Sequence, residues 1–150
     1  MAERRVTDAT RRARQMMIGG LVGGHTVGLT VIGLALALGG APAAVTAALG
    51  FAAVVIFYSV GQAIEVVASE LADFQGMALV LVSYAVRVIG IAAGLWFILS
   101  HPAVAPLVRD GWLLLSVAGT VLAWVTGVVL VAARQRVPVY DTEYHPPSLD

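Results

Sequence analysis

Four long apolar stretches dominate the pattern of the chain, and they cover about residues 16–38, 43–64, 77–99 and 112–133. Each is close to the roughly 20 residues that a helix rising 1.5 Å per residue needs to cross about 30 Å of hydrocarbon. The stretches lack the alternation of apolar and polar residues that barrel strands require. The pattern therefore predicts an all-α integral membrane protein, folded as a bundle of four transmembrane helices.

Helix-breaking residues separate these stretches. Residues 39–42 read Gly-Gly-Ala-Pro, which stops one helix and starts the next, so helices one and two should form a tight hairpin. Residues 100–111 hold two prolines, an arginine and an aspartate, too polar and broken to continue a span. We expect this second segment to be an external loop.

Arginines collect near the two ends of the chain: Arg4, Arg5, Arg11, Arg12 and Arg14 precede the first stretch, and Arg134 and Arg136 follow the last. Because arginine-rich flanks stay in the cytoplasm, we expect both termini there, N-in/C-in. Residues 1–15 form a basic segment suited to anionic membrane lipid. Residues 134–150 are too polar to fold alone and are predicted to be a disordered cytoplasmic tail.

A basic start followed by an apolar run is also typical of a secretory signal peptide. The run here is longer than the usual stretch of about 7 to 15 residues, and three more apolar stretches follow it. We therefore expect the first stretch to be retained as a helix.

Composition narrows the possible functions. Hydrophobic residues make up 59% and charged residues 12%, outside the usual balance of soluble proteins. The net charge is zero, which gives no support to nucleic-acid binding, and the chain has no cysteine for thiol chemistry or thiolate metal sites. Neither a phosphate loop nor a nucleophile with a matched base is found, so no enzymatic activity is predicted.

Glycines recur every four residues in the first stretch, at Gly20, Gly24 and Gly28. This spacing lets another helix approach closely in lipid. Similar repeats of small residues occur in the third and fourth stretches. Packing within one bundle explains all of them, and contact with a partner protein or a second copy of the chain is the alternative.

Arg87 lies about ten residues into the third stretch, near the bilayer midplane. An arginine there costs about 2.5 to 3.5 kcal/mol on insertion, so it should face the bundle or a partner. No acidic residue of this chain is expected at that depth. One alternative is hydrogen bonding within the bundle, to helix carbonyls or to Ser83, Tyr84 or His25; the other is a carboxylate of another membrane protein.

His25 should lie at nearly the depth of Arg87, on the first helix, so the two could face each other. A lone membrane histidine is more often a hydrogen-bonded packing residue than a haem ligand. No haem is therefore predicted.

Gln62, Glu65, Ser69 and Asp73 fall at helical spacing. They predict that helix two extends beyond the membrane with one polar stripe aimed at helix three. The stripe is either a solvated helix face or, through Glu65, Asp73 and the nearby Glu70, a site for Mg²⁺.

Several short segments together resemble the ATP synthase protein I family as it occurs in GC-rich bacteria. They are Phe57-Tyr58-Ser59-Val60-Gly61-Gln62, Gly76-Met77-Ala78, Tyr84-Ala85-Val86-Arg87, Leu122-Ala123-Trp124 and Val137-Pro138-Val139-Tyr140-Asp141. The resemblance covers about residues 14–141. It implies a protein of the bacterial plasma membrane that helps to assemble or stabilise the rotor ring of c subunits of F-type ATP synthase, with a role in magnesium supply also proposed. In that family the third helix often carries a lysine, and Arg87 stands at this position.

Two functional hypotheses follow. In the first, the protein is an accessory factor that contacts hydrophobic c subunits, and Arg87 neutralises a membrane carboxylate of the partner during assembly. The residues predicted to bind the partner are Arg87, His25, Gly20, Gly24 and Gly28. In the second, the protein is a small oligomeric cation (Mg²⁺) transporter or channel, with Glu65, Glu70 and Asp73 gathering cations at its inner mouth.

Overall fold

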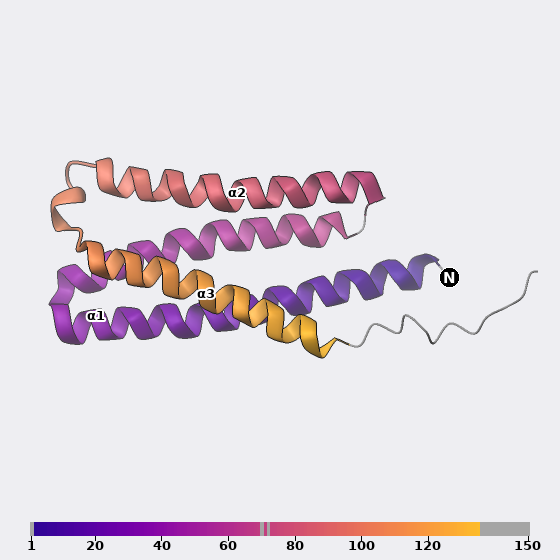
Figure 1. Cartoon of the computed structure of the whole chain (residues 1–150), viewed down its shortest axis with the longest axis horizontal. Helices are drawn as coiled ribbons and strands as arrows, with labels where there is room; N and C mark the ends of the chain where they lie inside the picture. Colours follow the sequence, from indigo (N-terminus) through magenta and orange to yellow (C-terminus); the bar gives the residue numbers. More distant parts are fainter. Residues whose placement is uncertain (1, 70, 72, 136–150) are drawn as a thin grey trace, which may run out of the picture.

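The computed structural model describes residues 2–69, 71 and 73–135, and it describes the side chains of residues 10–69, 71 and 74–135. Within these residues every regular element is helical (Figure 1): α1 spans Ala2–Ala68, α2 spans Asp73–Ser100, the short 3₁₀ helix η1 spans Ala105–Leu107, and α3 spans Asp110–Arg134. The helices α1, α2 and α3 are each long and apolar enough to cross a membrane. For these residues the structure confirms the prediction of an all-helical chain with helices long and apolar enough to span a membrane.

Helix α1 turns back on itself at Gly40, which gives it a first arm of residues 2–39 and a second arm of residues 41–68 (Figure 1). Gly40 has φ 71° and ψ −170°, a backbone conformation open essentially to glycine alone. Pro42 follows in the first turn of the second arm, where its missing N–H is not needed. The predicted reversal is therefore present inside one element, and the structure has three long helices where the sequence predicted four.

The two arms are held together by small apolar residues. Val31 and Ala35 of the first arm form a buried cluster with Ala43 and Ala47 of the second, and Trp112 of α3 packs against it. Small side chains let helix backbones approach closely, which gives the dispersion contacts that hold helices together in lipid.

Helix α2 lies along the second arm of α1, and α3 crosses both arms (Figure 1). One stripe of α3 is buried, namely Leu113, Ser116, Thr120 and Trp124. The Ser116 hydroxyl donates a 2.6 Å hydrogen bond to the carbonyl of Ala47, so even the polar members of this stripe contact α1. Helix α2 is far more exposed and shares its contacts chiefly with the second arm.

The beginning of α1 and the end of α3 lie at the same end of the bundle, together with the connection between α1 and α2 (Figure 1). The Nε2 atom of Gln135 donates to the carbonyl of Arg12 and to Oε1 of Gln15, each at 3.2 Å. The Gly40 turn and the connection between α2 and α3 lie at the opposite end. Glu70 and residues 136–150, with Arg136 and the predicted tail, lie outside the described residues, as do the side chains of Arg4 and Arg5.

Candidate functional site

Arg87 forms an ion pair with Glu65 of the same chain. The Nη2 atom of Arg87 lies 2.8 Å from Oε1 of Glu65, and the two side chains are 12% and 23% exposed. The expectation that no acidic residue of this chain would reach Arg87 was wrong.

The error has a geometric cause. Ser83 lies one turn before Arg87 on α2, and its backbone faces Gly61, one turn before Glu65 on α1. The backbones of Glu65 and Arg87 are thus offset by about two helical turns along the bundle axis. Helical side chains tilt toward the N-terminus of their own helix, and α1 and α2 run in opposite directions here, so the two long side chains reach toward each other.

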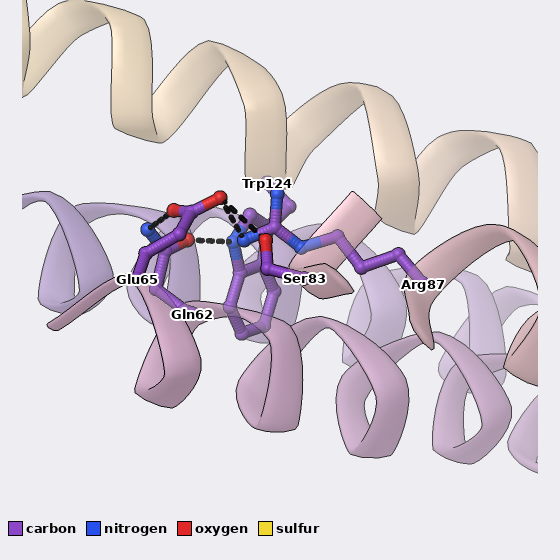
Figure 2. A network of polar contacts seen from close by, with 5 residues as sticks. All are labelled: Gln62, Glu65, Ser83, Arg87 and Trp124. Carbon is purple, nitrogen blue, oxygen red and sulfur yellow. Dashed lines mark hydrogen bonds and ion pairs between the residues drawn. The ribbon is translucent and has the colours of Figure 1, made fainter. Parts of the chain in front are cut away.

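The carboxylate of Glu65 contacts three side chains, one through an ion pair and two through hydrogen bonds (Figure 2). In addition to Arg87, its Oε1 accepts a 2.9 Å hydrogen bond from the Ser83 hydroxyl, and its Oε2 accepts a 2.7 Å bond from Nε2 of Gln62. The indole Nε1 of Trp124 points at Oε1 of Gln62 across a longer 3.4 Å. We call these five residues the ion-pair cluster; it joins the second arm of α1 to both α2 and α3.

Aromatic rings complete the surroundings of the guanidinium group. Its Cζ atom lies 5.3 Å from the ring centre of Tyr58 and 5.7 Å from that of Tyr84, distances at which a cation is attracted to the ring face. Gly61 leaves the necessary space, because a Cβ there would lie 2.5 Å from Nε of Arg87. The Nε and Nη2 atoms of Arg87 are buried and have no hydrogen-bond partner among the described residues, so Nη2 meets Glu65 as an ion pair without hydrogen-bond geometry. The charge is therefore balanced by one carboxylate and two rings within the chain.

The three glycines predicted to bind a partner face side chains of this chain. Gly20 and Gly24 lie against the indole ring of Trp124, and Gly28 lies against the ring of Phe51. A Cβ on Gly24 would be only 2.8 Å from Cε3 of Trp124. The structure thus places these glycines in the packing within the bundle, the first of the two interpretations of their spacing, and not on a surface free for a partner.

His25 also packs within the chain. Its Nδ1 lies 2.8 Å from the carbonyl of Leu21, one turn earlier in the same helix, and its ring meets Phe51 edge to face at 5.2 Å. His25 and Arg87, which could have faced each other by their depth, have separate partners in the structure. Consecutive residues of a helix project in directions that differ by about 100° around its axis. Because His25 comes one residue after Gly24, it faces the second arm of α1, whereas Gly24 faces Trp124.

The predicted Mg²⁺ site is described only in part. Glu65 is bonded to Arg87, Ser83 and Gln62, while the side chains of Glu70 and Asp73 lie outside the described residues. The described residues hold no group of three or more potential metal ligands of the histidine or carboxylate type. The predicted stripe from Gln62 to Asp73 is interrupted, because α1 ends at Ala68 and Asp73 already begins α2.

Sequence reasoning did not single out Tyr58 or Trp124 as parts of a site. Trp124 carried a usable signal, since it continues the spacing of Ser116 and Thr120 along one face of α3. Comparison of the chain with protein-family models, with curated proteins and with solved structures gives no match.

Proposed function

We propose that this protein crosses a bacterial plasma membrane four times, through the two arms of α1, through α2 and through α3, with both ends in the cytoplasm. We further propose that it is an accessory factor that assists assembly or stability of the c-subunit ring of F-type ATP synthase. The length and apolar character of the helices support the first statement. The reversal at Gly40 supports the count of four crossings.

The observation that carries the functional proposal is the convergence of separate segments on one cluster. Tyr58 and Gln62, then Tyr84 and Arg87, then Trp124 come from three of the segments that resemble ATP synthase protein I. A chain of contacts links the five: Tyr84 with Arg87, Arg87 with Tyr58, Tyr58 with Trp124, and Trp124 with Gln62. Ionisable residues inside a membrane protein are costly, and they usually mark its functional site.

The structure changes the role proposed for Arg87. Because Glu65 neutralises it, we propose that the ion-pair cluster fixes α2 against the second arm, and that the outward face of α2 contacts the c subunits. On that face Leu81, Val88 and Ile89 are each about two-thirds exposed. Helix α2 also has the smallest buried share of the three long helices, so most of its apolar side chains are free to meet a hydrophobic partner.

The test is c-ring assembly in cells that lack this protein, complemented by the parent chain or by variants. Leu81→Trp and Ile89→Trp should lower the amount of assembled c ring per unit of inserted protein, measured on native gels, because a bulky ring obstructs docking on α2. Leu122→Trp is the matched control, since Leu122 is 68% exposed but lies on α3. Normal c-ring assembly in the cells lacking the protein would refute the function, and equal yields from all three variants would refute docking on α2.

The proposed topology has its own test. A reporter fused after Asp150 should be active only in the cytoplasm, and one inserted between α2 and α3 only on the outside. Activity of the C-terminal fusion outside the cell would refute the N-in/C-in assignment.

The alternative of a Mg²⁺ transporter or channel is tested by ion flux in liposomes that hold this protein alone. Glu65, the one member of the predicted cation site whose side chain is described, is already occupied by Arg87, Ser83 and Gln62. No observation on the described residues therefore favours that alternative.

A further inference from the structure

A shallow groove runs along the seam between the first arm of α1 and α3. Its first part, about 510 Å³, is lined by Gln15 and Gly19 on α1 and by Gly127, Val131 and Arg134 on α3, among other residues. Its second part, about 480 Å³, continues toward Thr26 and Gly119. The two parts share Gly23, Gly127 and Leu130, so they form one continuous furrow.

The furrow results from a close helix crossing. A Cβ on Gly19 would meet the backbone carbonyl of Gly127, and a Cβ on Gly23 would meet that of Ala123, so the backbones nearly touch. Larger apolar side chains stand on both sides of this seam, with Val22 62% and Leu130 54% exposed. The floor is therefore backbone and the walls are hydrocarbon.

The length of the furrow matches one leaflet of a bilayer. It extends from Gln15 to Val27 along α1, which is about 18 Å at 1.5 Å per residue. One half of a hydrocarbon core is about 15 Å thick. The furrow begins at Gln15 of α1 and at Arg134, the last residue of α3, and it ends at Val27 and Gly119, near the middle of α3.

The mouth of the furrow is cationic. Arg134 lines it, and the exposed Arg14 lies next to Gln15 in the sequence. Of the carboxylates whose side chains are described, Glu65 is paired with Arg87 and Asp110 lies at the far end of α3. The fork of N–H groups on arginine fits a phosphate, and basic pockets between helices on the cytoplasmic side are suited to anionic head groups.

We propose that this furrow binds an anionic glycerophospholipid, with one acyl chain along the seam and the phosphate at Arg134. A hydrocarbon chain suits a furrow with a backbone floor and apolar walls, and an anionic head group suits the arginine at its mouth. The charge at the mouth selects an anionic lipid over a zwitterionic one. The proposal goes beyond a role in ATP synthase assembly, because it requires only that the protein lie in a membrane.

Native mass spectrometry of the full-length protein in detergent tests the proposal, using phosphatidylglycerol and phosphatidylcholine with the same acyl chains as probes. The parent should retain phosphatidylglycerol preferentially. Arg134→Gln should lower that preference about fivefold, the usual effect of one basic residue at an anionic membrane surface. Arg109→Gln, which changes an exposed arginine at the opposite end, should leave it unchanged.

A second variant pair tests the acyl chain. Thr126→Trp places a ring in the furrow and should weaken binding of both lipids, while Val125→Trp, a neighbour that does not line it, should bind like the parent. Glycerol phosphate without acyl chains should not bind above background. Equal lipid preference in Arg134→Gln and Arg109→Gln, unchanged binding by Thr126→Trp, or a dimer that retains no lipid would each overturn the proposal.

Discussion

Removing Arg87 should destabilise the protein, although removing a lone arginine from a membrane helix favours insertion. Arg87 is not alone, because Glu65 lies 2.8 Å away and is only 23% exposed. Arg87→Leu would leave the carboxylate of Glu65 with Ser83 and Gln62 as its described donors. Glu65→Gln would in turn leave the guanidinium group without a counter-charge. Each single variant should therefore cost more stability than the loss of one surface charge.

The size of the effect follows from distance and burial. Coulomb's law gives about 6 kcal/mol for unit charges 2.8 Å apart at an effective dielectric constant of about 20. Desolvation of both groups offsets much of this attraction. Breaking one partner of a buried pair costs about 3 to 5 kcal/mol, and the partial exposure here favours the lower figure. We expect about 3 kcal/mol for each single variant and a coupling of about 2 kcal/mol between them.

A double-mutant cycle measures this coupling. Parent, Arg87→Leu, Glu65→Gln and the double variant are unfolded in detergent micelles by a denaturant titration followed by circular dichroism. The double variant should be more stable than the sum of the single effects predicts, because neither charge is then left unpaired. Arg109→Leu, at an exposed arginine on the opposite side of the bundle, should change stability by less than about 0.5 kcal/mol.

A coupling energy below about 0.5 kcal/mol would refute this reasoning, since the coupling energy between interacting neighbours is normally larger than that. The variant Arg87→Lys tests the positive charge of the side chain separately from the planar shape of its guanidinium group. It should recover part of the stability lost in Arg87→Leu, because lysine restores the positive charge without the flat fork that faces Tyr58 and Tyr84.

Two further predictions concern the packing of α1 with α3. Gly24→Leu should lower the melting temperature in detergent, because the new side chain collides with Trp124. Gly33→Leu should melt like the parent, because a Cβ there meets nothing within 4 Å. Equal melting temperatures of the two variants would contradict the packing assigned to Gly24. Ser116→Ala should cost only about 0.5 to 1.5 kcal/mol in the same unfolding assay, because it removes one buried hydrogen bond to Ala47 and little volume, and a loss above about 3 kcal/mol would show that the site does more than this.

The sequence predicted well those features that depend on local rules. The Gly-Gly-Ala-Pro segment at residues 39–42 predicted a reversal, and the structure has it at Gly40, where only glycine fits the backbone. Hydropathy predicted where the apolar helices lie along the chain, but not the residues at which they begin and end. Helix α2 begins at Asp73 and α3 at Asp110, both outside the apolar stretches, because a helix continues into polar sequence as long as its backbone hydrogen bonds are formed.

The candidate site was only partly predictable, because depth along a helix axis does not locate the end of a long side chain. Counting residues put Glu65 near the membrane surface and Arg87 near its middle, yet both side chains extend along the axis toward each other. The direction of the His25 side chain could not be predicted from the sequence either. It depends on how the first arm is rotated about its own axis, and that rotation is set by the contacts of Gly20 and Gly24 with Trp124.

The ion pair also bears on which face of α2 points outward. In a bilayer, an apolar side chain gains little free energy when it turns from lipid toward protein. Apolar contacts alone therefore favour one rotation of a helix about its axis only weakly. Leu81 and Val88 would be nearly as well accommodated against α1 as against lipid. Arg87 would not, because turning α2 by half a revolution would bring its charge into hydrocarbon and leave Glu65 behind. The pair thus penalises the other rotations of α2 more than any apolar contact does. It follows that the face proposed to meet the c subunits is fixed by a charge on the opposite side of the same helix.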